Sequence, residues 1–249
     1  MERRKFLGIS FGFGALVPLG CATAKRTADA NQHAAGNLQL KGKERSKVTH
    51  WDVITIGNLS RNRYWGESEE KALHPVICTT TVITVDGRHV VVDPSLKDAN
   101  AMADELKRRT GLSPDNIDLV FVTHEHEDHH IGMPHFPKAQ WLASPLAAEA
   151  INTGFRYAKK VQPVNDKIYD AIDVIHIPGH TPGTSGLRFD YRGLSVFTVG
   201  DAVATKDFWD EGRIYFKALN TEEALRSYKK IASVADIVVP GHDNYFLCR

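Results

Sequence analysis

The sequence predicts a layered α/β domain built on a mixed β-sheet, and two observations support this. Short apolar segments rich in Val, Ile and Thr alternate with helical patterns over residues 48–249. Turn signals typical of antiparallel hairpins occur within the same alternation. Because strands that alternate with helices are typical of layered α/β folds, we expect one such domain over these residues.

The domain is predicted to begin with strands. Residues 52–56 alternate polar and apolar side chains, as a half-buried strand does. Residues 76–85 are rich in Thr, Val and Ile and lead through Asp86-Gly87 into a Val run at 90–92. An Asp-Gly pair between β-branched runs is a strong signal for a β-hairpin, so we expect an antiparallel pair here.

A helix and a buried strand follow the hairpin. Residues 98–110 carry apolar side chains at helical spacing, and Gly111 is expected to end this helix. The short apolar run at 117–122 has the length and composition of a buried strand. A strand at 140–143 and a short helix at 145–151 complete this half.

The second half of the domain continues the alternation. Strands are expected at 172–177, 187–189, 194–199 and 237–239. Tyr191-Arg192-Gly193 is expected to form a hairpin turn between the second and third of them. The amphipathic segment 221–232 is predicted to be a helix, because Glu222 and Glu223 in its first turn suit the helix dipole.

Composition excludes several classes of protein. The chain has 249 residues, of which 42% are hydrophobic and 24% charged, as in an ordinary soluble globular protein. The formal net charge of +1 argues against attraction to polyanions, so no nucleic acid is expected as a partner. Three cysteines exclude a disulfide scaffold. Histidine is the unusual residue type, because four of the 12 histidines lie between residues 124 and 130.

The N-terminus is predicted to be an export signal. Arg3 and Arg4 precede a short apolar stretch that is too short and glycine-rich for a transmembrane helix. Residues 1–24 resemble a twin-arginine signal, so we expect the twin-arginine export machinery as a partner and a periplasmic or extracellular location. Residues 25–47 lack periodicity and are predicted to be a flexible linker.

The end of this signal has two interpretations. Ala22-Thr23-Ala24 is a small-x-small site, which favours cleavage after Ala24 and soluble export. Leu19-Gly20-Cys21 resembles a lipoprotein site, which would leave a lipid anchor at Cys21 and a membrane-anchored protein. Pro18 occupies a position where such sites usually hold an aliphatic residue, so soluble export is favoured.

Polar side chains are dense where the predicted strand 117–122 ends. His124, His126 and Asp128 alternate along the following residues and can point to one side of an extended loop. His129 follows as the chain turns. Imidazole and carboxylate are ligands that suit zinc, iron and manganese, so this segment predicts a metal site.

Three other predicted strands also end in a candidate ligand. His180, Asp201 and His242 each come shortly after the last residue of an apolar strand. In α/β folds, the ends of strands are where sites are assembled. We therefore expect these three residues to join the histidine-rich segment in one site.

The order and spacing of these motifs resemble the metallo-β-lactamase superfamily. The likeness rests on His-x-His-x-Asp-His at 124–129, Gly-His-Thr-Pro-Gly at 179–183, Gly-Asp at 200–201 and Gly-His at 241–242. It spans roughly residues 52–246. The resemblance implies a four-layer αβ/βα sandwich with two mixed β-sheets and a metal pair between the sheet edges.

The resemblance also implies which residues hold each metal. By motif, the first ion would be bound by His124, His126 and His180, the second by Asp128, His129 and His242, and both by a bridging Asp201. We expect two divalent ions, with zinc as the favoured metal and iron or manganese as alternatives. Two such ions can hold a bridging hydroxide at neutral pH, which would attack a carbonyl while Asp128 accepts or shuttles the proton. The expected reaction is hydrolysis of an ester, lactone, thioester or amide, with a small molecule as the substrate.

Residue types narrow the branch of the family. Its commonest zinc β-lactamases carry cysteine where this chain has Asp201, and neither Cys78 nor Cys248 falls at a ligand position, which argues against β-lactamase activity. The Asp201 version resembles glyoxalase II-like thioesterases and acyl-homoserine lactonases. The tail at 239–246 resembles the small proteins called metallo-β-lactamase domain-containing protein 1. The alternatives are an iron-dependent oxygenase resembling the sulfur dioxygenases, or a non-catalytic metal-binding protein on the same fold.

One departure from the family pattern leaves a ligand open. Family members usually have one residue between Asp-His and a glycine, whereas two residues precede Gly132 here. His130 is therefore an alternative to His129 as a ligand of the second metal, although His129 is favoured. His130 is otherwise expected to line the substrate pocket, together with Phe208 and Trp209.

Overall fold

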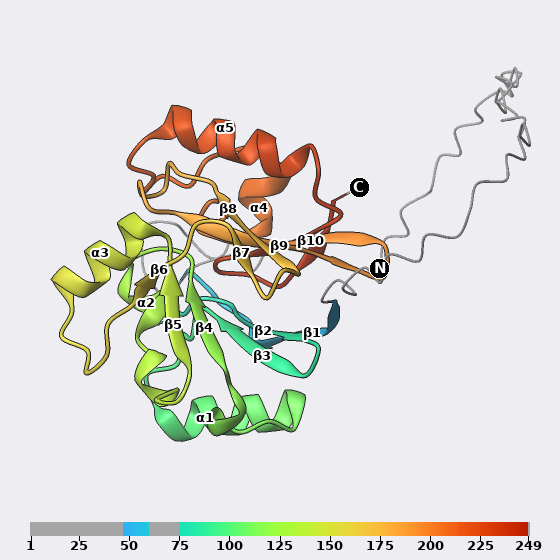
Figure 1. The fold of residues 1–249 in the computed structure, drawn as a ribbon. Coiled ribbons are helices and arrows are strands. Elements are labelled where there is room, and N and C mark those ends of the chain that lie inside the picture. Colours follow the sequence, from blue (N-terminus) through green and yellow to red (C-terminus); the bar gives the residue numbers. More distant parts are fainter. Residues whose placement is uncertain (1–46, 60–74, 249) are drawn as a thin grey trace, which may run out of the picture. The chain divides into compact units, whose positions relative to one another are not determined.

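The computed structural model describes residues 47–59 and 75–248, which fall in one compact unit (Figure 1). The predicted signal at 1–24, the anchor at Cys21 and nearly all of the linker at 25–47 lie outside the described residues. Export and anchoring therefore stay predictions. Within the part of the chain that is described, no helix is both long and apolar enough to cross a membrane.

The first sheet is mixed. In order across the sheet, its strands are β1 (Val48–Thr55), β2 (Thr80–Val85), β3 (Arg88–Val92), β4 (Leu119–Val122), β5 (Gln140–Ala143) and β6 (Gln162–Pro163). β1, β2 and β3 pair antiparallel, whereas β3 to β6 pair in parallel. Asp86 and Gly87 form the predicted hairpin turn with φ values of 48° and 80°, as a tight hairpin requires.

The second sheet is also mixed. In order across the sheet, its strands are β12 (Phe246–Leu247), β11 (Ile237–Pro240), β10 (Leu194–Gly200), β9 (Ser185–Tyr191), β8 (Ile172–His176) and β7 (Lys167–Ile168). β10 and β11 are parallel, and the other neighbours are antiparallel. Arg192 and Gly193 turn the chain between β9 and β10 with positive φ, as the sequence predicted.

The helices are α1 (Ala99–Thr110), α2 (Glu127–His130), α3 (Pro145–Gly154), α4 (Lys206–Asp210) and α5 (Thr221–Ala232), with short 3₁₀ turns at Pro114–Asn116 and Met133–His135. The three longest, α1, α3 and α5, cover the outer faces of the two sheets. Figure 1 shows α1 against one sheet and α5 against the other. The carboxylate of Asp98 accepts a hydrogen bond from the N–H of Ala101 and begins α1, and Gly111 ends it at a φ of 74°.

Three apolar layers hold this arrangement together. Phe121 of β4 and Phe189 of β9 belong to the core between the sheets. Val120 and Val122, which point the other way along β4, pack with Leu106 of α1 in a second core. α5 closes a third core on the far face of the second sheet. The layers are therefore αβ/βα, and the predicted four-layer sandwich with two mixed sheets is confirmed.

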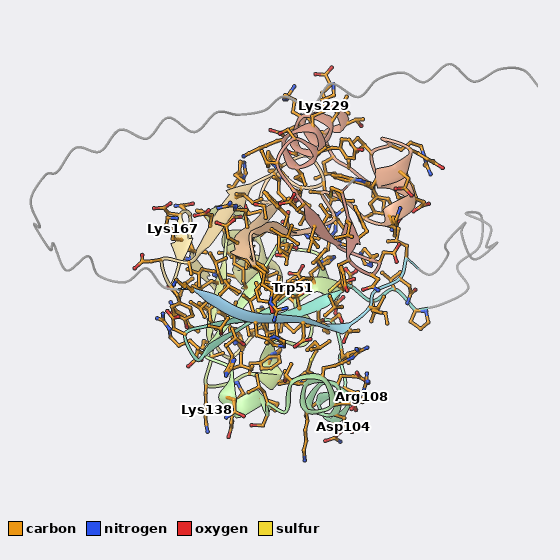
Figure 2. The ribbon with its side chains drawn as sticks, turned by 90° about the vertical axis from the view of Figure 1, so that its right-hand side faces the viewer. Trp51, Asp104, Arg108, Lys138, Lys167 and Lys229 are labelled. Atoms are coloured by element: carbon orange, nitrogen blue, oxygen red, sulfur yellow. The ribbon has the colours of Figure 1, made fainter. Side chains whose placement is uncertain are left out.

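Charged side chains lie on the outer helices. Figure 2 shows Asp104 and Arg108 on α1 and Lys229 on α5, all pointing away from the sheets. Trp51 of β1 lies between these two ends and makes an edge-to-face contact with Phe189, with ring centroids 6.2 Å apart. Polar outer faces and apolar inner faces are what the helical periodicity predicted.

Two short helices differ from the sequence-based expectation. The segment after β4 is extended only as far as His126, and α2 begins at Glu127, where an extended loop was expected. α4 begins at Lys206 in a segment for which the sequence predicted no helix. Neither helix has a long apolar repeat, because four or five residues cannot show the 3.6-residue period on which the prediction rests.

Candidate metal centre

The predicted metal ligands follow strands that end at one edge of the sandwich. β8, β10 and β11 run in the same direction, because β9 is antiparallel to β8 and β10, and β11 is parallel to β10. Their ends place His180, Asp201 and His242 along one sheet edge. The N–H of Ser185 in β9 donates to the carbonyl of Thr123 after β4 (2.9 Å), which joins that edge to the histidine-rich segment.

A glycine is required where two of these strand ends meet. A Cβ atom at Gly241 would lie only 2.1 Å from Oδ1 of Asp201. No side chain fits in that space, so glycine lets the backbone before His242 approach the Asp201 carboxylate. This contact explains the Gly-His pair after β11.

The first group of ligand atoms belongs to three histidines. Nδ1 of His126 lies 3.1 Å from Nε2 of His124 and 2.9 Å from Nε2 of His180. Oδ2 of Asp201 lies 3.3 Å from the same Nε2 of His180. Ligands about 2.0–2.1 Å from a tetrahedral zinc ion are roughly 3.3 Å apart, so this spacing fits one such ion.

The second group surrounds the other oxygen of Asp201. Oδ1 of Asp201 lies 3.3 Å from Nε2 of His129 and 3.1 Å from Nε2 of His242. Oδ2 of Asp128 lies 3.4 Å from Nε2 of His242 and 3.8 Å from Nε2 of His129. The Asp201 carboxylate therefore turns one oxygen to each group, which is the arrangement of a bridging ligand.

Buried polar atoms in these groups lack hydrogen-bond partners. Nε2 of His129 and Oδ1 of Asp201 are both buried and have no such partner among the described residues. Leaving a buried polar group unpaired costs about 1–3 kcal/mol, and a cation between the two atoms would remove that cost. The donor atoms are imidazole nitrogens and carboxylate oxygens, so the residues present fit a pair of divalent ions such as zinc.

Burial keeps two histidines of the first group neutral. Burial, reinforced by the neighbouring His129, holds the pKa of His124 well below its usual range. Burial also lowers the pKa of His180 to about 4. Both imidazoles are therefore neutral at neutral pH, and only the neutral ring offers a lone pair to a metal.

The charge balance in the second group is different. Burial would raise the pKa of Asp201, but the imidazoles of His242 and His129 outweigh it and hold that pKa well below its usual value. Burial lowers the pKa of His242, yet the Asp201 carboxylate outweighs burial and raises it. Protons and cations therefore compete for this group, so metal binding here is expected to release protons.

Hydrogen bonds fix the tautomer of two of the candidate ligand histidines, His124 and His242. Nδ1 of His124 lies 3.1 Å from the hydroxyl of Thr123, and Nδ1 of His242 lies 2.9 Å from the carbonyl oxygen of Ile77. A proton on each Nδ1 satisfies these contacts and leaves the Nε2 lone pair facing the site. Such outer partners orient metal-binding imidazoles in many proteins.

Asp93 is a residue of the site that the sequence analysis missed. Its Oδ1 accepts a hydrogen bond from the N–H of Thr123 (2.7 Å), and its Oδ2 accepts one from the Thr123 hydroxyl (2.7 Å). The same Oδ2 lies 2.9 Å from Nδ1 of His129 and so holds that ring with Nε2 toward the site. A signal was present, because Asp93 directly follows an apolar strand, and the candidate metal ligands also lie shortly after strand ends.

Cys78 lies beside the second group without facing the cavity. Its thiol donates to the carbonyl of Asp93 (3.3 Å), and its sulfur lies within 4.8 Å of ligand atoms of Asp93 and His129. Burial raises the pKa of Cys78 to about 12, so it is a thiol rather than a thiolate at neutral pH. A protonated thiol is a poor metal ligand.

The structure places His130 away from the predicted metal ligands. Its Nδ1 lies 2.8 Å from the hydroxyl of Tyr157, and its ring meets Phe155 edge to face at a centroid distance of 4.4 Å. Its Nε2 lies 3.2 Å from the carbonyl oxygen of Glu125. His130, which was expected to line the substrate pocket, is not among the residues that line the cavity over the site, and His129 rather than His130 faces the second group.

A cavity opens directly over the two groups. Beyond the candidate ligands, its walls include Leu59, Val76, Phe208, Tyr215, Phe216 and Lys217. Phe208 thus lies where the sequence analysis expected it. Trp209 does not, because its ring packs against Tyr228 and Phe246 on the other side of α4. Adjacent residues of a helix point about 100° apart, which separates these two aromatic side chains.

Gly179 supports the loop that carries His180, and its replacement by alanine is expected to destabilise the protein. Gly179 has a φ of 128°, and an added Cβ would lie 2.2 Å from the backbone nitrogen of Ala224. We expect Gly179→Ala to lower the free energy of unfolding by about 2–3 kcal/mol, measured by denaturant titration. Gly154→Ala is the control, because nothing lies within 4 Å of its added Cβ. Equal stability of the two variants would contradict this account.

The fold and the site together define a metal-binding α/β protein with ligands from two sheet edges. The family model of the metallo-beta-lactamase superfamily matches residues 74–242, more than half of the chain. The chain belongs to this superfamily. The match begins before β2 and ends on His242, so it contains all seven candidate ligands.

Two relatives of this chain have names that state an activity. The chain is 34% identical over 157 residues to a protein of Methanocaldococcus jannaschii named as a probable metallo-hydrolase, covering 62% of this chain and 70% of the relative. It is 28% identical over 165 residues to an N-acyl homoserine lactonase of a Bacillus species, covering 60% of this chain. The match spans 65% of the length of that lactonase.

Solved structures share the fold. The dizinc quorum-quenching lactonase AidC, in complex with a product, superposes with a TM-score of 0.53 at 16% identity over 66% of this chain and 72% of its own. A mutant of Bacillus thuringiensis AiiA with N-decanoyl-L-homoserine bound gives a TM-score of 0.56 at 18% identity over 80% of this chain and 94% of its own. At these identities the likeness shows the fold alone.

Proposed function

We propose that this chain is a hydrolase that uses two divalent ions to cleave an ester, lactone, thioester or amide. Zinc is the preferred metal in this proposal, and iron and manganese are the alternatives. The observation that carries the proposal is the Asp201 carboxylate, whose two oxygens face two separate groups of histidines. Bound ions would activate water as a nucleophile and polarise the carbonyl of the substrate. The relatives named as lactonases make lactones the first substrate class to test.

The residues around the cavity have distinct roles in this proposal. The apolar side chains of Leu59, Val76 and Phe208 would contact the body of a small-molecule substrate and exclude water. Asp128 has a 28% exposed side chain, whereas Asp201 has 5%, so Asp128 is the carboxylate that a substrate can reach. It would accept a proton from the attacking water and return it to the leaving group.

The ligand set supports hydrolysis over the two alternatives. An oxygenase with a single iron would use only part of the seven residues, whereas here both groups are assembled around a shared carboxylate. A protein that only stores metal would have no need of an accessible Asp128 beside a cavity that is walled in part by apolar side chains. Both alternatives give outcomes that the following experiment separates from hydrolysis.

The test is turnover by the zinc-loaded protein on a panel of lactones, thioesters, esters and β-lactams. Asp128→Asn is expected to lower kcat/KM on any accepted substrate by at least about 100-fold, because it removes the proton acceptor. Glu127→Gln, at the exposed neighbouring position, is the matched control and is expected to stay within about twofold of wild type. Hydrolysis rates and metal content are measured on the same samples.

Two results would contradict the proposal. No turnover of any panel substrate by protein that holds two metals would favour a metal-binding protein without catalysis. A single iron per chain, with oxygen consumption in place of hydrolysis, would favour the oxygenase. We expect no β-lactam turnover, because Asp201 stands where the commonest zinc β-lactamases carry cysteine.

A further inference from the structure

The loop between α4 and α5 is fastened to the loop that carries His180. The N–H of Leu219 donates to the carbonyl of His180 (3.1 Å), and the N–H of Asn220 donates to the carbonyl of Gly179 (2.9 Å). The N–H of Ala218 donates to the carbonyl of Tyr215 (3.0 Å), which turns the loop back toward the cavity. The loop and the His180 backbone therefore form one hydrogen-bonded unit.

Tyr215 in this loop lies against the ring of His180. The two rings are stacked, with centroids 5.8 Å apart and planes at 22°. Tyr215 is only 8% exposed and is held in turn by an edge-to-face contact with Phe208, at a centroid distance of 5.4 Å. A tyrosine with so little freedom fixes the plane of the imidazole that it covers.

His180 differs from His124 and His129 in how its outer nitrogen is held. Nδ1 of His124 faces Thr123, and Nδ1 of His129 faces Asp93. Nδ1 of His180 is buried and has no hydrogen-bond partner among the described residues. A metal-binding imidazole normally has such a partner to set its orientation.

We propose that Tyr215 is the positioning residue for His180 and that ring stacking takes the place of the missing hydrogen bond. The inference rests on the proposed two-metal site and concerns its first ion. Stacking fixes the tilt of the ring so that Nε2 stays 2.9 Å from Nδ1 of His126 and 3.3 Å from Oδ2 of Asp201. Without the Tyr215 ring, His180 rotates more freely and the affinity of the first group for metal falls.

The experiment compares Tyr215→Leu with Tyr215→Phe in the full-length protein. Zinc affinity is measured by competition with a chelator, and cobalt-substituted protein gives a spectrum that reports ligand geometry. We expect Tyr215→Leu to lower the binding affinity for one of the two zinc ions by roughly three- to tenfold and to change the spectrum of the cobalt-substituted protein. Tyr215→Phe keeps the ring and is expected to match wild type. His180→Ala identifies which ion is affected.

A matched control separates positioning from general destabilisation. Tyr228→Leu removes another tyrosine ring of the same half of the fold, where it packs on Trp209 with its hydroxyl donating to the Trp209 carbonyl (2.9 Å). We expect this variant to lose stability in thermal melting but to keep the zinc affinity of wild type. Equal zinc affinity in Tyr215→Leu and Tyr228→Leu would overturn the inference.

Two further outcomes are informative. If Tyr215→Phe loses as much zinc affinity as Tyr215→Leu, the hydroxyl acts and the stacking account is wrong. If wild type binds fewer than two zinc ions, the proposed function fails, and this result is distinct from failure of the positioning role, in which wild type binds two ions and Tyr215→Leu binds them equally well.

Discussion

Replacing Asp201 by asparagine is expected to weaken the binding of both metal ions, because this side chain is shared by the two groups of candidate ligands. Its Oδ2 lies 3.3 Å from Nε2 of His180, and its Oδ1 lies 3.1 Å from Nε2 of His242. An amide carries no negative charge and offers one oxygen instead of two. Removing one partner of a buried charged pair costs about 3–5 kcal/mol, which is roughly two to three and a half orders of magnitude in a binding constant.

The measurement is the zinc content of Asp201→Asn after dialysis, with affinity determined by chelator competition. Asp190→Asn is the matched control, because Asp190 is an exposed carboxylate of the same half of the fold and forms an ion pair with Arg188, away from the candidate ligands. It is expected to bind zinc as wild type does. If Asp201→Asn keeps one ion at wild-type affinity, Asp201 serves a single group and does not bridge.

Replacing Asp93 by asparagine is expected to weaken mainly the binding of the second metal ion. Asp93 Oδ2 faces Nδ1 of His129 at 2.9 Å, and both of its oxygens accept hydrogen bonds from Thr123. An amide nitrogen in place of Oδ1 would face the N–H of Thr123, and in place of Oδ2 it would face the N–H at Nδ1 of His129, so in either case two donors would meet. Loss of such an outer partner typically lowers metal affinity by about 10- to 100-fold, and we expect this range for Asp93→Asn.

The control for this variant is Asp118→Asn. Asp118 also accepts a backbone hydrogen bond through one carboxylate oxygen, from the N–H of His89 (2.8 Å), but it is exposed and precedes β4, whereas His124 follows the other end of that strand. Zinc affinity and thermal stability are measured for both variants. Equal affinity for the second ion in the two proteins would show that Asp93 supports the fold but does not orient His129.

Much of the fold could be predicted because its signals are local. Asp98 and Gly111 mark the two ends of α1, and the Asp86-Gly87 pair marks the β2–β3 turn. The run at 119–122 is apolar throughout because alternate residues of β4 pack into two different cores, one between the sheets and one under α1. The candidate ligands could be proposed for the same reason, since each one lies shortly after a recognisable strand.

The remaining parts of the site depend on contacts that no local pattern encodes. His129 and His130 are adjacent in sequence, and only the start of α2 at Glu127 decides which of them faces Asp201, because helix neighbours point about 100° apart. Tyr215 reaches His180 from a loop 35 residues further along the chain, held by backbone hydrogen bonds that leave no sequence signature. Asp93 was missed although it obeys the same strand-end rule.

The most direct test of the central claim is the metal content of the wild-type protein reconstituted with zinc and freed of excess ions. Two groups that share Asp201 predict two zinc ions per chain, with both bound more weakly when Asp201 is changed. One zinc ion per chain at saturation, or none, would contradict the account, because the second group of Asp128, His129 and His242 would then have no role in metal binding.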